Sequence, residues 1–163
     1  MEGACGVIIS TDDPTVVVKR IYKRSGPHRR IKSHRAPMQC TIQSWAHDLC
    51  QPSNGYSVLY VPRAWDAEEH QYKMERIDIT TPLMNEGIPV DELKAFYKDA
   101  KTEGIFPCDY ELYKQPDGRV AMVDFDKFAR WLPDGTAAFP WGQILARPLS
   151  PFEEKIERVG RGW

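Results

Sequence analysis

The ten residues from Asp117 to Asp126 constrain the fold of this chain more than any other stretch. A Pro-Asp-Gly turn opens them, an apolar run follows, and they end in Val-Asp-Phe-Asp. A turn of this composition before strand-forming residues predicts a β-hairpin. Asp124, between a valine and a phenylalanine, is costly to bury unless a cation meets it. The sequence therefore predicts a hairpin ending in a carboxylate, which either meets a lysine or metal ion or caps the next turn.

Two segments resemble parts of the protein-kinase-like superfamily. The end of the hairpin resembles the metal-binding Asp-Phe-Gly segment, with Asp126 in place of the glycine. In that superfamily a strand lysine meets the nucleotide phosphates and a helix glutamate. Residues 16–21, Val-Val-Val-Lys-Arg-Ile, resemble that strand, and two early glycines resemble the end of the glycine-rich loop. The nucleotide-site remnant that the resemblance implies consists of Lys19, Gly3, Gly6 and Asp124, with the lysine and the aspartate facing each other across one cleft.

The first half of the chain predicts strands around one helix. Alternation over residues 15–22 places Val17, Lys19 and Ile21 on one face of a strand. A helix is expected from Pro37, and its apolar stripe consists of Met38, Ile42, Trp45 and Leu49. Two further strands are expected, with polar loops between the elements; the strands are residues 56–61 and 71–77, and the loops are residues 23–36 and 63–70. The expected fold class is α+β, and the resemblance implies a minimal protein-kinase-like fold whose N-lobe is an antiparallel sheet of five or six strands with one helix.

The second half predicts fewer elements. A helix is expected from Pro89, with acids in its first turn and a glycine after its last turn. The hairpin follows, and then the aromatic residues of the segment 128–141, which lack a helical period and predict a loop. Ser150 opens a last short helix. The expected organisation is a single domain over residues 1–163, in which 1–80 resembles the N-lobe and 81–163 a trimmed C-lobe.

The resemblance also implies that the residues for phosphoryl transfer are largely replaced. Counting back from Asp124 without a gap, the superfamily's catalytic aspartate falls on Phe106 and its metal-binding asparagine on Glu111. Phenylalanine cannot accept the proton of an attacking hydroxyl. Asp109 takes the place of the catalytic aspartate only if the loop shifts by three residues. Glu111 and Asp124 retain the carboxylate oxygens that magnesium takes, whereas the predicted first helix contains no glutamate to pair with the strand lysine.

The net charge of −1 is unevenly distributed along the chain. Residues 19–35 carry eight basic side chains, and no acid occurs between Asp13 and Asp48. Beyond Lys19 and Arg20, the basic patch consists of Lys23, Arg24, Arg29, Arg30, Lys32 and Arg35. Such a run is either a solvated loop or a docking site for nucleic acid or an acidic partner protein.

The composition is that of a soluble globular protein, 42% hydrophobic and 28% charged, without an apolar run of the ~20 residues that span a bilayer. Four widely spaced cysteines show no metal-finger spacing, so reduced thiols are expected. No secretion signal is expected at the N-terminus. The expected location is the cytoplasm or nucleus. Trimmed kinase-like chains resemble products of large DNA viruses, and for a viral product the virion is an alternative location.

Three hypotheses of function follow. The first is a catalytically impaired kinase-like protein, a pseudokinase, that acts as a binding or regulatory module on a protein partner and needs no cofactor. The second is a minimal kinase that uses ATP and magnesium, with Asp109 as the base and Glu111 and Asp124 on the metal. The third is a module that docks nucleic acid or an acidic partner on residues 19–35. None of the three involves a membrane.

Overall fold

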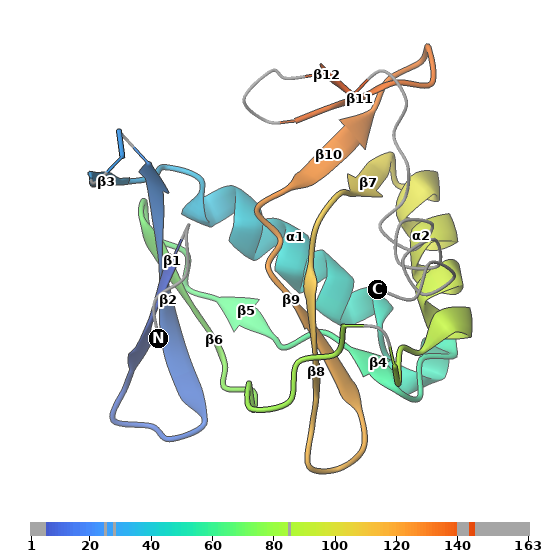
Figure 1. Cartoon of the computed structure of the whole chain (residues 1–163), viewed down its shortest axis with the longest axis horizontal. Helices are drawn as coiled ribbons and strands as arrows, with labels where there is room; N and C mark the ends of the chain where they lie inside the picture. The colour runs from blue at the N-terminus through green and yellow to red at the C-terminus, as the bar shows by residue number, and fades with distance from the viewer. Residues whose placement is uncertain (1–5, 25, 28, 85, 140–143, 146–163) are drawn as a thin grey trace. The chain divides into compact units, whose positions relative to one another are not determined.

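The computed structural model describes residues 6–24, 26–27, 29–84, 86–139 and 144–145. Over these residues the chain is a mixed α+β protein with antiparallel sheets and two α-helices (Figure 1). It divides into two compact units: the first is Met1–Leu49 with Val61–Ile77, and the second is Cys50–Tyr60 with Asp78–Trp163. Residues 50–60 thus group with the second half of the chain. No helix in the described residues is long and apolar enough to cross a membrane.

The first unit is built on β2 (Val16–Arg24), a nine-residue strand that begins with three valines. One edge of β2 pairs with β1 (Gly6–Ser10), and the other pairs with β6 (Gln71–Glu75), which pairs in turn with β5 (Ala64–Trp65). Strand β3 (Arg30–Lys32) also pairs with β2, so the sheet has five strands, all antiparallel. The antiparallel sheet is as predicted, but β3 and β5 arise in segments whose polar residues predicted loops.

Helix α1 (Ala36–Leu49) packs against β5 and β6, and its predicted start is confirmed. The four residues of its predicted apolar stripe are each partly buried. The fully buried face beside it consists of Ala36, Gln39, Cys40, Gln43 and Ala46. Gln43 can be buried because its amide bonds to the sheet: Nε2 donates to the Pro62 carbonyl at 2.9 Å, and Oε1 accepts from the Tyr72 hydroxyl at 2.9 Å.

The second unit contains two small sheets and helix α2 (Val90–Thr102). The predicted hairpin is confirmed, with β8 (Glu111–Lys114) antiparallel to β9 (Val120–Val123) and Gly118 in the turn at φ 89°. On its other side β9 pairs in parallel with β4 (Leu59–Tyr60), which follows the short 3-10 helix η1 (Pro52–Asn54). The other sheet has the order β12 (Ile144–Leu145), β11 (Ala137–Ala138), β10 (Phe128–Trp131), β7 (Ile105–Pro107).

Two predictions for these segments are wrong. Residues 56–61 do not add a strand to the first sheet, because only Leu59–Tyr60 is extended and it pairs with β9. The described part of the segment 128–141 is not a loop, since it forms β10 and β11. Phe106, Ala129 and Ala137 make a buried cluster there, against which Trp131 and Phe139 pack. Trp141 and the helix expected from Ser150 lie outside the described residues.

The first turn of α2 holds the backbone that leads into β4. The carboxylate of Glu92 accepts from the N–H groups of Ser57, of Val58 at 3.0 Å and of Leu59 at 3.2 Å. One turn before the helix ends, Asp99 accepts from the Tyr56 hydroxyl at 2.9 Å. Burial, and then this hydrogen bond, raise the pKa of Tyr56. These contacts explain why residues 50–60 group with the second unit, although they follow α1 directly.

Candidate functional site

Asp124 occupies the end of β9 in an uncommon backbone conformation. Its φ is 75°, in the left-handed region that residues other than glycine rarely adopt, although aspartate tolerates it better than most. The side chain is half-buried. Directly after it, Phe125 is fully buried and its ring lies 4.8 Å from that of Phe128, and Asp126 is buried as well. The buried phenylalanine fixes the chain on one side of Asp124, and β9 fixes it on the other.

Glu111 lies beside Asp124 across the hairpin. In the β8–β9 register Glu111 is the partner of Val123, the residue before Asp124. The Tyr113 hydroxyl donates to Glu111 Oε2 at 2.7 Å. Burial, then the Glu111 hydrogen bond and charge, and finally the charge of Asp124 raise the pKa of Tyr113 to about 12. Both carboxylates therefore act on one phenol at the end of the hairpin.

This site offers two hard oxygen ligands from two side chains. Magnesium commonly binds through one or two carboxylates and completes its shell with water or phosphate oxygens. In the described part of the chain, neither Glu111 nor Asp124 belongs to a group of three metal-capable side chains. The pair could therefore hold magnesium only together with water or a phosphate group.

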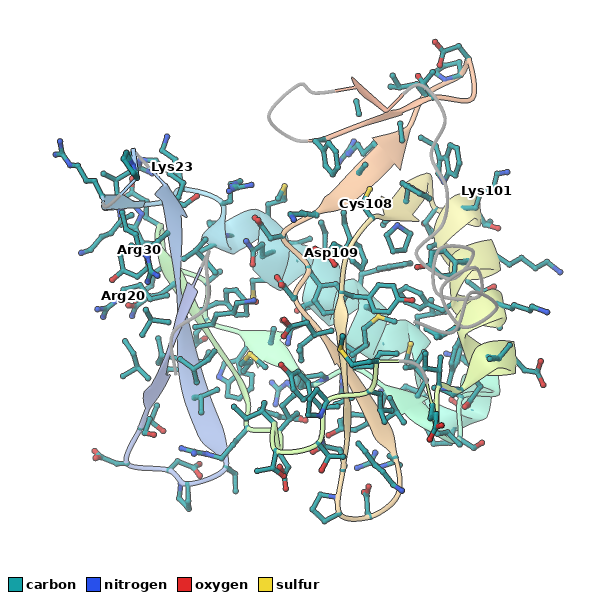
Figure 2. All side chains as sticks on the ribbon, in the orientation of Figure 1. Arg20, Lys23, Arg30, Lys101, Cys108 and Asp109 are labelled. Carbon is teal, nitrogen blue, oxygen red and sulfur yellow. The ribbon has the colours of Figure 1, made fainter. Side chains whose placement is uncertain are left out.

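The two positions tied to general-base catalysis differ in their surroundings. Phe106 is 3% exposed, and its ring meets that of Trp131 edge-on at 5.1 Å. Asp109 is exposed at the surface, where Lys127 Nζ lies 3.2 Å from its Oδ2, and the backbone N–H of Cys108 donates to the Lys127 carbonyl at 3.1 Å. Figure 2 labels Cys108 and Asp109 at the end of β7. Phe106, the position reached by counting back from Asp124, is thus part of the core. Asp109, three residues later, forms an ion pair at the surface.

Lys19 lies on the face of the first sheet that α1 covers. It pairs with Ile8 on β1 and with Tyr72 on β6, and opposed residues in an antiparallel pair point to the same face. Tyr72 reaches α1 through its hydroxyl, so this is the helix-covered face. The predicted alternation is confirmed: Val17 and Ile21 are buried, and Lys19 between them is half-buried.

The surroundings of Lys19 are tight on the β1 side. Gly6 is the first residue of β1, and a Cβ there would meet the Arg20 carbonyl oxygen at 3.2 Å and Lys19 Cε at 3.5 Å. A glycine at this position thus leaves room for the lysine stem. On the helix side, the buried polar residues of α1 are Gln39 and Gln43, where the resemblance calls for a glutamate. Gly3 lies outside the described residues.

The basic patch of the sequence divides between two faces of the β2–β3 hairpin. In the register Tyr22 opposes Lys32, and Lys23 opposes Ile31. Strand alternation therefore puts Arg20, Tyr22, Arg30 and Lys32 on the face away from α1, which we call the basic face. Lys23 points to the other side, and Arg29 precedes β3. Figure 2 shows the side chains of Arg20, Lys23 and Arg30 around this hairpin.

The structure adds contacts to the basic patch that the sequence did not predict. Arg20 is half-buried and its Nε donates to Gln71 Oε1 at 3.1 Å. Arg35 stands before α1, where its Nε lies 3.4 Å from Ser33 Oγ. The turn before β6 brings Glu69 to 2.7 Å from His34, which follows β3. One carboxylate, that of Glu69, thus reaches the neighbourhood of the basic patch from a segment that is remote in sequence.

The comparisons with known proteins give no further guidance. No family model, no curated protein and no solved structure matches this chain. Because Lys19 belongs to the first unit and Asp124 to the second, their pairing stays a prediction.

Proposed function

We propose that the chain is a kinase-like protein that acts by binding and does not transfer phosphate. The resemblance carried by Lys19 and Asp124 supports the kinship. Two local arrangements agree with it: the lysine lies on the helix-covered face of an antiparallel sheet, and the aspartate ends a hairpin beside a second carboxylate. The observation that carries the loss of catalysis is the burial of Phe106, which is 3% exposed and packed against Trp131. A core phenylalanine supplies no base for an attacking hydroxyl.

The alternative of a minimal active kinase depends on Asp109. A general base must lie within hydrogen-bond reach of the proton that it removes and must have a lone pair available to accept it. Asp109 is 55% exposed and forms an ion pair with Lys127 at 3.2 Å, so both its accessibility to water and its lysine partner oppose that role. Glu111 and Asp124 remain able to share a magnesium ion with phosphate oxygens, which makes nucleotide binding without transfer the form of activity to look for first.

The test is a thermal melt of the full chain with magnesium and ATP, run beside a phosphate-transfer assay. We expect no transfer and little or no stabilisation, because α1 contains no glutamate at the place where the resemblance calls for one. A ligand at about 100 times its dissociation constant stabilises a protein by roughly 2.7 kcal/mol. A stabilisation of that size that disappears in Asp124→Asn, but not in the surface control Lys98→Met, shows nucleotide binding. It overturns the expectation that this kinase-like protein binds no nucleotide. Transfer that Asp109→Asn abolishes overturns the proposal itself.

A second candidate function is docking of an acidic partner on the basic face. The observation that favours it is the placement of Arg20, Arg30 and Lys32 around Tyr22 on one side of the hairpin. Cations next to an aromatic ring suit both the phosphates and the bases of single-stranded nucleic acid, and the same cations suit an acidic protein segment. The basic face is in the first unit and needs no residue of the second, so this function is separable from that of Asp124.

Docking is tested by fluorescence anisotropy with a single-stranded DNA oligonucleotide at several salt concentrations. Binding to phosphates loses affinity with salt, with a slope of roughly −0.7 per contact for a single strand. We expect Arg30→Glu with Lys32→Glu to abolish most of the binding, and the matched pair Lys98→Glu with Lys114→Glu, exposed residues of the second unit, to leave the salt slope unchanged. A flat salt response, or equal losses in the two double variants, contradicts nucleic-acid docking.

A further inference from the structure

Two histidines and a glutamate come together in the first unit. The ligand atoms of His34, Glu69 and His70 all lie within 4.8 Å of one another, and no other group of three metal-capable side chains occurs among the described residues. His34 Nδ1 lies 2.7 Å from Glu69 Oε1, and His70 Nε2 lies 3.5 Å from Glu69 Oε2. The two imidazole rings are 4.8 Å apart and tilted. The three side chains thus enclose one point, although 35 positions separate His34 from Glu69 in the sequence.

The backbone beneath this group is fixed by one buried residue of β2. Ile21, which has no exposed surface, donates its N–H to the His70 carbonyl at 2.8 Å and accepts from the Ser33 N–H at 3.0 Å. The turn carrying Glu69 and His70 is closed by the Glu68 N–H, which donates to the Gln71 carbonyl at 2.7 Å. The segments that carry the three side chains are therefore both hydrogen-bonded to one residue of the central strand.

His70 is already oriented as a ligand. Its Nδ1 lies 3.0 Å from the Ser33 carbonyl oxygen, an acceptor only, so Nδ1 carries the proton and donates it. The neutral ring then presents the Nε2 lone pair on the side of Glu69. A hydrogen bond from the second ring nitrogen to a backbone carbonyl is the usual outer-shell support of a metal-bound histidine, because it fixes the tautomer and the ring plane. His70 is also the least exposed of the three, at 24%, against 69% for His34 and 66% for Glu69.

We propose that His34, Glu69 and His70 bind a divalent transition-metal ion, with zinc as the best fit. Imidazole is a ligand that suits zinc rather than calcium or magnesium, and two imidazoles with one carboxylate are a known ligand set of zinc. A tetrahedral ion with bonds of about 2.0–2.1 Å sets its ligand atoms roughly 3.3 Å apart. To reach this spacing, the 2.7 Å distance between His34 Nδ1 and Glu69 Oε1 must increase and the longer distances between ligand atoms must decrease. Rotation of the exposed His34 and Glu69 side chains allows both changes. Three protein ligands leave the fourth position to water or to a donor group of a bound molecule.

The test is calorimetric titration of the metal-stripped full chain, without any affinity tag, with Zn²⁺. We expect one zinc per chain, and binding at least about tenfold weaker in His34→Gln and in Glu69→Gln. Both substitutions are at exposed positions, so the fold is retained, and circular dichroism checks this. The matched control is Glu68→Gln, which removes the same charge from the same turn, and its affinity should equal that of the unsubstituted chain.

A second readout identifies the ligands directly. With Co²⁺ in place of zinc, the visible bands of a low-coordinate ion with nitrogen and oxygen ligands should form and should vanish in Glu69→Gln. A near-ultraviolet thiolate-to-metal band would place the ion on a cysteine and overturn the proposal. It is equally overturned if no saturable heat is found up to about 1 mM zinc, a limit of roughly −4.1 kcal/mol, or if Glu68→Gln weakens binding as much as Glu69→Gln does.

Discussion

The left-handed backbone of Asp124 gives a direct prediction about stability. A side chain with a Cβ pays roughly 1 kcal/mol in this conformation, whereas glycine does not. Asp124→Gly and Asp124→Ala remove the same carboxylate, so they differ mainly in this backbone cost. We expect Asp124→Ala to be less stable than Asp124→Gly by about 1 kcal/mol, measured by urea denaturation. Equal stabilities would mean that the hairpin end relaxes to an ordinary conformation when the carboxylate is removed.

Tyr113 reports on the two carboxylates of the same site. Burial, the hydrogen bond to Glu111 and the neighbouring charges raise the folded pKa of Tyr113 to about 12, above the usual tyrosine pKa of about 10, because they disfavour the phenolate. The contribution of this phenol to stability is therefore complete below pH 10 and is lost as the pH rises through about 12. We expect Glu111→Gln and Asp124→Asn each to lower the pKa, read as the tyrosinate absorbance that Tyr113→Phe removes. An unchanged pKa in both variants would contradict the site geometry, and a decrease on adding magnesium would place the ion beside Glu111.

Single residues also show how far the sequence could predict the candidate sites. The position of Asp124 at the end of a hairpin was predictable, because its turn and apolar run are local signals. The face of Lys19 was predictable too, because strand alternation needs no knowledge of the partner strand. The group of His34, Glu69 and His70 was not predictable, since no sequence pattern links residues 35 positions apart. What joins them is the pairing of Ile21 with both segments.

At the scale of elements, α1 shows why hydrophobic periodicity alone does not identify the most buried face of a helix. The apolar stripe of this helix is only partly buried, and two glutamines lie on the fully buried face. Burying an amide is favourable only when its hydrogen bonds are kept, and strand β6 and Pro62, which precedes β5, supply the partners of Gln43. Ser44 takes part as well, because its hydroxyl donates to the Ala64 carbonyl at 2.8 Å. A partner that lies on another element cannot be read from the helix sequence.

The attachment of α1 to the sheet can be measured at Gln43. Gln43→Leu keeps the approximate volume but leaves the Pro62 carbonyl and the Tyr72 hydroxyl without the amide. Since each buried polar group left unsatisfied costs about 1–3 kcal/mol, we expect a loss of roughly 2–4 kcal/mol in the free energy of unfolding. The control is Thr41→Ala on the exposed side of the same helix, expected to change stability by less than about 0.5 kcal/mol. A loss below 1 kcal/mol for Gln43→Leu would mean that water replaces the amide.

Strands whose partners are distant in sequence account for the two wrong predictions in residues 56–61 and 128–141. The hairpin of β8 and β9 was found because both strands and their turn lie within a few residues. The parallel pairing of β4 with β9 joins Leu59 to Val120, and the pairing of β7 with β10 joins Phe106 to Ala129. No turn signal marks either pair. The aromatic residues after Asp126 were therefore read as a loop, although they form a sheet around Phe106.

At the scale of the whole molecule, the chain passes between the two units three times, after Leu49, Tyr60 and Ile77. Cutting the chain after Ile77 therefore leaves the second unit without β4 and without the Tyr56 and Glu92 contacts. We expect fragment 78–163 alone to lack a cooperative thermal transition, and co-expression with fragment 1–77 to restore one, measured by circular dichroism. The control is a cut in the exposed turn after Gly118, with both fragments present, which breaks the chain once but keeps residues 50–60 on the same fragment as α2 and β8. A cooperative transition in 78–163 alone would show that β4 is dispensable.

During synthesis at the ribosome, β4 can pair only after its partner strand β9 has been made. The first unit is complete in sequence once Ile77 has emerged, whereas Leu59 waits for Val120. At translation rates of about 5–20 residues per second, that wait lasts roughly 3–12 s. For the part of this time that follows the emergence of Ile77, the first unit is complete in sequence while residues 50–60 still lack their partner strand β9. A chaperone that covers this segment, or a translational pause before Val120, would therefore change the yield of folded protein.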